Sequence, residues 1–202
     1  MPNIVRVKVR IEGTTPLLMN RFHDEAAMNA TSGTRGAQIT QSRGTPQEIA
    51  EKKIYRDLQN KACIPQPNLL RCLVEGGYFH KAGKKQLTTK KSSILYACLD
   101  IEGATIPLKH KEPWRIDVRP IVIPSTAGRI LCHRPIFDGW SLEFILLVDV
   151  GIIDVKLCRS IVDDAGQRIG LGDFRPSCKG PFGKFVVTLW AVQEIPLQEA
   201  AE

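Results

Sequence analysis

The paired cysteines that mark disulfide scaffolds and zinc sites are missing from this sequence. Its six cysteines, at positions 63, 72, 98, 132, 158 and 178, are scattered and form no Cys-x-x-Cys pair. Zinc sites and small secreted scaffolds depend on regular cysteine spacings, so we interpret these residues as reduced thiols. A zinc site built on Cys132, His133 and distant ligands has no paired motif to support it. We therefore expect no metal ion and no other cofactor.

Long apolar runs and aromatic residues are also scarce. No stretch approaches the roughly 20 apolar residues of a membrane-spanning helix, and the opening MPNIVRVKVRIEG alternates instead of forming a signal-peptide core. We expect a cytoplasmic protein with no membrane partner. Only 7 Phe, 3 Trp and 3 Tyr are present, which argues against a platform of stacked bases.

Positive charge is the main excess. Among 202 residues, 28 Lys and Arg exceed 21 Asp and Glu, for a net charge of +7. A basic balance favours an acidic partner, and nucleic acid before membrane. The length suits one domain with insertions, or at most two small domains.

A basic, glycine-rich stretch organises the chain. Residues 169–187 read IGLGDFRPSCKGPFGKFVV and follow a helical pattern and precede a strand pattern. Glycine lets another backbone approach closely, and basic side chains attract phosphates, so this loop suits a phosphate chain. The alternative is a surface connection that needs turn residues. The relevant residues are Gly170, Gly172, Gly180, Gly183, Arg175, Lys179 and Lys184.

Two nucleotide-binding motifs are excluded here. A dinucleotide fingerprint follows a strand and opens a helix, whereas this loop follows a helix and opens a strand. A phosphate loop of nucleotide triphosphatases ends in Gly-Lys-Ser/Thr, but Gly183 and Lys184 are followed by Phe185. The sequence therefore does not support nucleotide hydrolysis.

The first strand is predicted over residues 4–12, with Val and Ile on one face and charged residues on the other. Its charged face carries Arg6, Lys8 and Arg10 at two-residue spacing. The alternatives are a solvated sheet face and a row of phosphate contacts. Because the chain also has a basic glycine-rich loop, we favour phosphate contacts over a solvated face. We expect the first strand and the loop to contact the same RNA strand along one path.

The remaining patterns predict an α+β order. Thr45–Glu48 forms a capping box for a helix that runs to Leu58. Further helices are predicted from residue 68 and over 154–165. Strands are predicted over 94–101, 106–108, 114–118, 140–148 and 182–192. Long insertions fall at 20–45, 80–93 and 119–139.

This order matches a ferredoxin-like core, that is, a split βαβ or RRM-like arrangement with a glycine-rich loop before the last strand. We expect residues 1–202 to form a single RNA-binding domain with those three insertions. Its helices would cover one face of the sheet, and Arg6, Lys8 and Arg10 would lie on the other, open face. The polar insertion 80–93, with its five lysines, would be a mobile loop or a phosphate-contacting arm.

The loop GLGDFRPSCKGPFGKFVV resembles the glycine-rich loop of the RAMP superfamily of CRISPR-associated RNA-binding proteins. The Gly-Thr-Thr-Pro-Leu-Leu segment after the first strand is similar to theirs, and the insertions resemble those of the repeating backbone subunit of CRISPR effector complexes. The resemblance implies subunits that polymerise along a guide RNA. It also implies a protruding thumb hairpin that interrupts base pairing, which residues 119–139 would match by position.

On this resemblance we expect a non-catalytic subunit of an antiviral ribonucleoprotein that binds single-stranded guide RNA in multiple copies. Its partners would be copies of itself, other effector-complex subunits, and a target DNA or RNA that pairs with the guide. The expected RNA-binding residues are Arg6, Lys8, Arg10, Arg21, Arg129, Arg134, Gly170, Gly172, Arg175, Lys179, Gly180 and Lys184.

Two other functions stay open. Some RAMP relatives are ribonucleases that use a histidine or a loop aspartate, and His23 and Asp24 lie in the first long loop. His80 and His133 are further candidates, because a histidine of ordinary pKa can transfer protons at neutral pH. The third possibility is a structural protein that happens to be basic.

Overall fold

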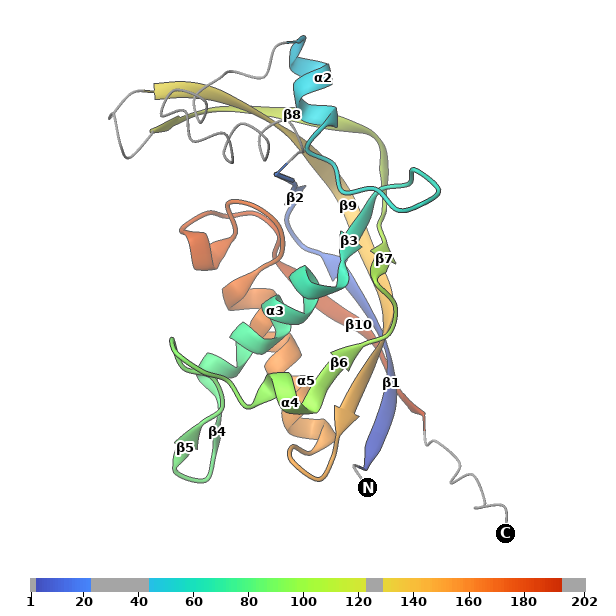
Figure 1. Cartoon of the computed structure of the whole chain (residues 1–202), viewed down its shortest axis with the longest axis vertical. Coiled ribbons are helices and arrows are strands. Elements are labelled where there is room, and N and C mark those ends of the chain that lie inside the picture. Colours follow the sequence, from blue (N-terminus) through green and yellow to red (C-terminus); the bar gives the residue numbers. More distant parts are fainter. Residues whose placement is uncertain (1–2, 23–43, 123–128, 194–202) are drawn as a thin grey trace, which may run out of the picture.

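An antiparallel six-stranded sheet forms the body of the protein (Figure 1). The structure is a computed structural model, and it describes residues 3–22, 44–122 and 129–193. Four strands lie in the order β10 (Phe185–Gln193), β1 (Ile4–Gly13), β9 (Arg129–Asp149) and β6 (Leu99–Ile101). In the chain, α3 (Gln66–Gly76) lies between β1 and β6, and α5 (Val155–Asp164) lies between β9 and β10. This is the ferredoxin-like α+β core that the sequence predicted.

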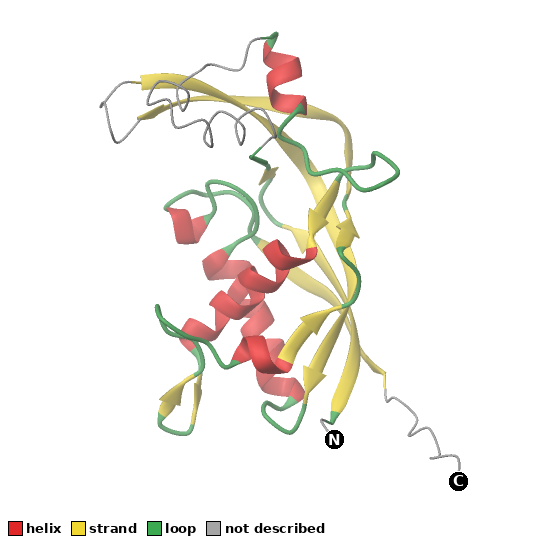
Figure 2. Ribbon diagram, viewed as in Figure 1, coloured by secondary structure: helices red, strands yellow, loops and turns green. Residues whose placement is uncertain are grey.

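The two helices lie together on one face of this sheet (Figure 2). Val7, Val9 and Ile11 of β1 are completely buried in a core that also contains Leu73 of α3 and Ile161 of α5. The predicted alternation of β1 is therefore confirmed, because successive side chains of a strand point to opposite faces. Its charged residues lie on the face away from the helices.

A long hairpin extends from the core. It is formed by β8 (Lys109–Val122) and the first half of β9, and it projects beyond the helices at the top of Figure 1. Arg119 pairs with Cys132 and Val122 pairs with Arg129, so the predicted excursion 119–139 is a protruding hairpin. Its tip, residues 123–128, lies outside the described residues. Val118 of β8 is half-exposed.

Shorter elements complete the fold. They are β2 (Leu17–Leu18), α2 (Pro46–Glu51), β3 (Cys63–Pro65), η2 (Gly77–Phe79), β4 (Lys81–Ala82), β5 (Lys85–Gln86), α4 (Leu95–Cys98), β7 (Thr105–Pro107), the π-helical η3 (Ala165–Ile169) and η4 (Pro176–Cys178). β2 pairs with β9 and β3 pairs with β7. The predicted capping box is present at α2, where Thr45 and Glu48 each accept the other's backbone N–H.

Three predicted boundaries were wrong. The first helix ends at Glu51 rather than Leu58, because the Asp57 carboxylate accepts the N–H groups of Gln59 and Lys61 and closes a turn instead. The predicted strand 94–101 begins with α4, and the last strand begins at Phe185 rather than residue 182.

The lysine-rich segment 80–93 is not an irregular loop. It contains the small β4–β5 hairpin, and its far end is attached to the core because the Thr88 hydroxyl donates to the Val74 carbonyl at 2.8 Å. Across the described ranges, no helix has the length and hydropathy needed to span a membrane. Those ranges also contain no group of three or more His, Cys, Asp or Glu side chains placed to hold a metal ion.

Candidate nucleic-acid interface

The glycine-rich loop between α5 and β10 lies on the helix side of the sheet and is tied to β2. The Asp173 N–H donates to the Leu18 carbonyl, and the Gly183 N–H donates to the Pro16 carbonyl, both at 2.8 Å. The buried Cys72 thiol of α3 donates to the Gly170 carbonyl at 3.2 Å. The loop is therefore an ordered platform, because other elements take up its backbone hydrogen-bonding groups.

The glycines of this loop make room for the protein's own backbone. A Cβ on Gly172 would overlap the Leu18 carbonyl, and one on Gly180 would overlap the Phe174 carbonyl. Gly170 and Gly172 also have φ values of +76° and +81°, which side-chain-bearing residues rarely adopt. We expected these glycines to admit a phosphate chain. Their neighbours show instead that they are needed for the loop to fold.

A buried arginine joins the loop to the hairpin. Arg134 of β9 lies 2.8 Å from the Asp173 carboxylate of the loop and 2.9 Å from the Asp117 carboxylate of β8. Burial by itself lowers the pKa of the Arg134 guanidinium, but the hydrogen bond and charge of Asp173 and the hydrogen bond of Asp117 outweigh burial and raise it. We expected Arg134 to contact RNA. It is 5% exposed and hydrogen-bonded to two carboxylates, so it holds the hairpin on the loop instead.

Two phenylalanines reinforce this contact. The Arg119 guanidinium of β8 lies 4.8 Å from the centre of the Phe182 ring and 5.8 Å from that of Phe174, distances typical of cation–π pairs. The Asp117 carboxylate holds Arg119 at 2.7 Å. Neither phenylalanine was among the functional residues expected from the sequence. Each phenylalanine has a glycine on one side and a proline on the other: Phe174 lies between Gly172 and Pro176, and Phe182 lies between Pro181 and Gly183. That pattern was the available signal that they pack inside a structured loop.

Three predicted cations lie on the loop itself. Arg175 donates to the Gly172 carbonyl at 3.0 Å and lies 3.8 Å from Glu75 of α3. Lys179 is exposed at the end of η4. Lys184 directly precedes β10, and its backbone N–H donates to the Thr15 hydroxyl. Neither lysine has an ion pair within the described residues. These two charges are therefore available to a phosphate without displacing a carboxylate.

The cations of β1 are arranged differently. Arg6 pairs with Glu102 at 2.7 Å, Lys8 with Glu143 at 2.8 Å and Arg10 with Glu12 at 3.2 Å. The hydrogen bond and charge of Lys8 lower the pKa of Glu143. These pairs are on the sheet face away from the helices, whereas the glycine-rich loop is on the helix side. A single RNA path that touches both groups of cations would have to reach both faces of the sheet, and the expectation that one exists stays a prediction.

The other predicted residues are dispersed. Arg21 follows β2, and its N–H donates to the Lys53 carbonyl at 3.0 Å. Arg129 is exposed near the hairpin tip and has no ion pair within the described ranges. His23 and Asp24 lie outside those ranges, so the structure neither groups nor separates them.

The two further candidate histidines, His80 and His133, do not form a pair. Nε2 of His80 lies 2.9 Å from the carboxylate of Asp164, the last residue of α5, at ion-pair distance but without hydrogen-bond geometry. His133 lies on the hairpin opposite Val118. The structure therefore does not bring these two candidate acid–base groups into one site.

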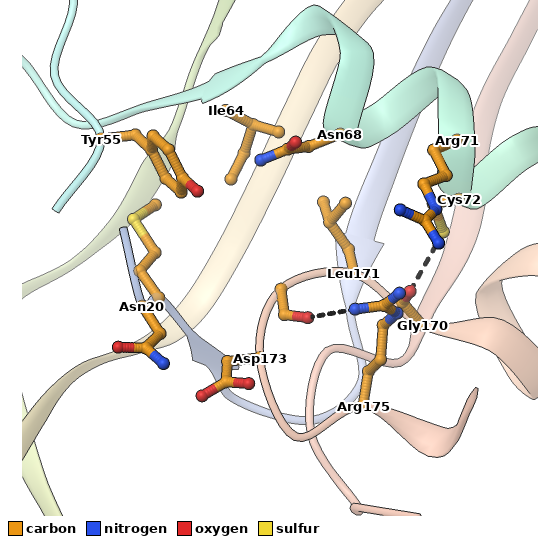
Figure 3. A pocket seen from close by; sticks show the side chains of 12 residues that line it. Asn20, Tyr55, Ile64, Asn68, Arg71, Cys72, Gly170, Leu171, Asp173 and Arg175 are labelled. Carbon is orange, nitrogen blue, oxygen red and sulfur yellow. Dashed lines mark hydrogen bonds between the residues drawn. The ribbon is translucent and has the colours of Figure 1, made fainter. Parts of the chain in front are cut away.

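A cleft of about 250 Å³ opens beside the loop (Figure 3). No local pattern in the sequence predicts this cleft, because its walls come from separate parts of the chain. It is lined by Met19, Asn20, Tyr55, Ile64, Asn68, Arg71, Cys72, Gly170, Leu171, Gly172, Asp173 and Arg175. Burial raises the pKa of the Cys72 thiol to about 12, so this thiol is no nucleophile at neutral pH.

Comparison with known proteins identifies the fold. No protein-family model and no curated protein matches the sequence. Among solved structures, the chain is similar to a chain in the cryo-EM structure of the Type III-B Cmr-beta bound to cognate target RNA, with a TM-score of 0.54 and 12% sequence identity. The match covers 95% of this chain and 61% of that chain, so the present chain spans less than two thirds of its length. At this identity the likeness shows a shared fold.

Proposed function

We propose that this chain is a non-catalytic, RAMP-type subunit that binds single-stranded RNA in a CRISPR effector complex. The observation that carries the proposal is the fold, which nearly the whole chain shares with a chain from Cmr-beta bound to target RNA. The net charge of +7 supports the same kind of partner, since phosphates supply much of the affinity of RNA-binding proteins.

The proposed RNA path follows the helix side of the sheet. It runs along the glycine-rich loop, where Arg175, Lys179 and Lys184 contact phosphates, and toward the hairpin, where Arg129 is exposed. Arg134 and Asp173 support this path by fixing the angle between hairpin and loop. The paired cations of β1 contribute less, because each already has a carboxylate within 3.2 Å.

The protruding hairpin supports the further proposal that several copies assemble along one guide RNA. In that arrangement the β8–β9 hairpin serves as the thumb between segments of paired bases. Other effector subunits and a target strand would complete the particle. Residues 1–202 act as one RNA-binding domain with insertions in this proposal.

The test is to purify the chain and examine what accompanies it. We expect a nucleoprotein absorbance ratio and a bound RNA population of defined length. The stripped protein should bind single-stranded RNA, with an affinity that falls linearly with salt on a log–log scale by about 0.7 per neutralised phosphate. A preparation free of nucleic acid that binds no RNA at low salt would overturn the proposal.

A further inference from the structure

We propose that the cleft beside the glycine-rich loop binds one nucleobase of the RNA, turned out of the stack of its neighbours. The inference rests on the proposed function, because the base belongs to the RNA that the loop holds. It goes further, because phosphate contacts alone carry no base identity. A base in this cleft would give the subunit a sequence preference at one position.

Unpaired polar side chains form the edge of the cleft. Asn20 follows β2, Tyr55 follows α2 and Asn68 lies in the first turn of α3, and Figure 3 shows all three around the same opening. Their side chains make no hydrogen bond to any described residue. An amide offers two donors and an acceptor, and a phenol offers one of each. Such groups hydrogen-bond the edges of unstacked bases in single-stranded RNA.

The inner wall of the cleft is apolar. Met19, Ile64 and Leu171 are each at most 3% exposed, and the Tyr55 ring packs against the same core. A flat heteroaromatic ring matches an apolar wall with a polar rim. Ligand pockets for drug-sized molecules measure about 300–1,000 Å³. The present cleft, at about 250 Å³, is sized for one ring system rather than for an oligonucleotide.

Two arginines mark where the attached phosphate would lie. Arg71 lies 2.9 Å and Arg175 lies 3.8 Å from the Glu75 carboxylate, so one glutamate holds both side chains beside the cleft. A phosphate has more charge and more acceptor oxygens to offer them than the single carboxylate. Base and phosphate of one nucleotide therefore find complementary groups on adjacent sides of the cleft.

The test compares two fluorescent single-stranded RNAs of equal length, one normal and one carrying abasic sites throughout. The variants are Asn68→Ala and Tyr55→Phe. Asn68 is exposed on a helix and the Tyr55→Phe change keeps the ring, so both variants should fold. Asn3→Ala, which removes an exposed amide just before β1, is the matched control.

We expect each cleft variant to weaken binding of normal RNA about 2- to 12-fold, the range for losing one hydrogen bond. Binding of abasic RNA, the salt slope and the Asn3→Ala control should be unchanged. If the variants weaken both RNAs equally, or neither, the cleft does not bind a base although the chain binds RNA. If the wild-type chain binds neither RNA at low salt, the proposed function itself fails.

Discussion

Nη1 of Arg134 lies 2.8 Å from Oδ2 of Asp173, although the two residues are 39 positions apart. One belongs to the hairpin and the other to the glycine-rich loop. Because the arginine is buried and also binds Asp117 of β8, it connects the hairpin to the loop through two ion pairs. The hairpin and the glycine-rich loop, both of which the resemblance connects with RNA binding, are thus held in a defined relative position.

Removing this arginine should destabilise the fold. Arg134→Ala leaves the buried Asp117 carboxylate with Arg119 as its remaining partner, and breaking a buried ion pair costs roughly 3–5 kcal/mol. Urea denaturation should show that loss. Arg115→Ala is the control, because its pair with Asp138 is exposed and such pairs contribute about 0–1 kcal/mol. Equal losses in the two variants would contradict the proposed role of Arg134.

Two triple substitutions distinguish the two faces of the sheet. Arg175, Lys179 and Lys184 changed to Gln should reduce the log–log salt slope of RNA binding by about 2, since each lost phosphate contact contributes about 0.7. The same change at Arg6, Lys8 and Arg10 removes equal charge from the opposite face. We expect a smaller effect there, because carboxylates already partner these cations. The reverse order of effects would restore the original interpretation of β1 as the main phosphate contact.

Gly172→Val should lower stability before it lowers RNA affinity. The residue has a φ of +81°, and a side chain would also overlap the Leu18 carbonyl. Left-handed backbone alone costs about 1–2 kcal/mol for other residues. Gly83→Val is the control, since its φ is +60° but nothing lies within 4 Å of its Cβ position. A Gly172 variant with unchanged thermal stability and reduced RNA affinity would show that RNA, not Leu18, approaches this glycine.

Cys178 should report on occupancy of the loop. It is exposed between Arg175 and Lys179, whereas the other five cysteines are buried. Burial raises the pKa of the Cys98 thiol to about 11 and that of Cys158 to about 12, so their reactive thiolates are rare at neutral pH. Iodoacetamide should therefore modify Cys178 first, and single-stranded RNA should slow that reaction. Modification at the same rate with and without saturating RNA would count against an RNA path over this loop.

His23→Ala and Asp24→Ala should leave RNA binding intact, because we propose a non-catalytic subunit. Both residues lie outside the described ranges, so this expectation comes from the sequence. Incubation with labelled single-stranded RNA, with and without Mg²⁺, tests it. If the wild-type chain cuts RNA and either variant does not, the ribonuclease interpretation replaces the present one.

The sequence by itself determined the layers of the fold. The alternation in β1, the in-phase apolar residues of β9 and the buried stripe of α5 each show which face meets the core. The spacing of apolar residues along a strand or helix is a local property of the sequence, and it directly indicates which side chains are buried. The order of these elements along the chain was then sufficient to predict a ferredoxin-like sheet.

Only the tertiary structure decided what the polar residues do. Arg134 and Lys179 are both basic residues in the sequence, yet Arg134 is buried and paired with Asp117 and Asp173, whereas Lys179 is exposed. The partners of Arg6 and Lys8, the backbone that fills the space beside Gly172, and the cleft beside Asn68 all come from distant parts of the chain. Ion pairs and hydrogen bonds depend on which groups lie close together in the folded protein. Residues far apart in the sequence make these contacts, so no local sequence pattern predicts them.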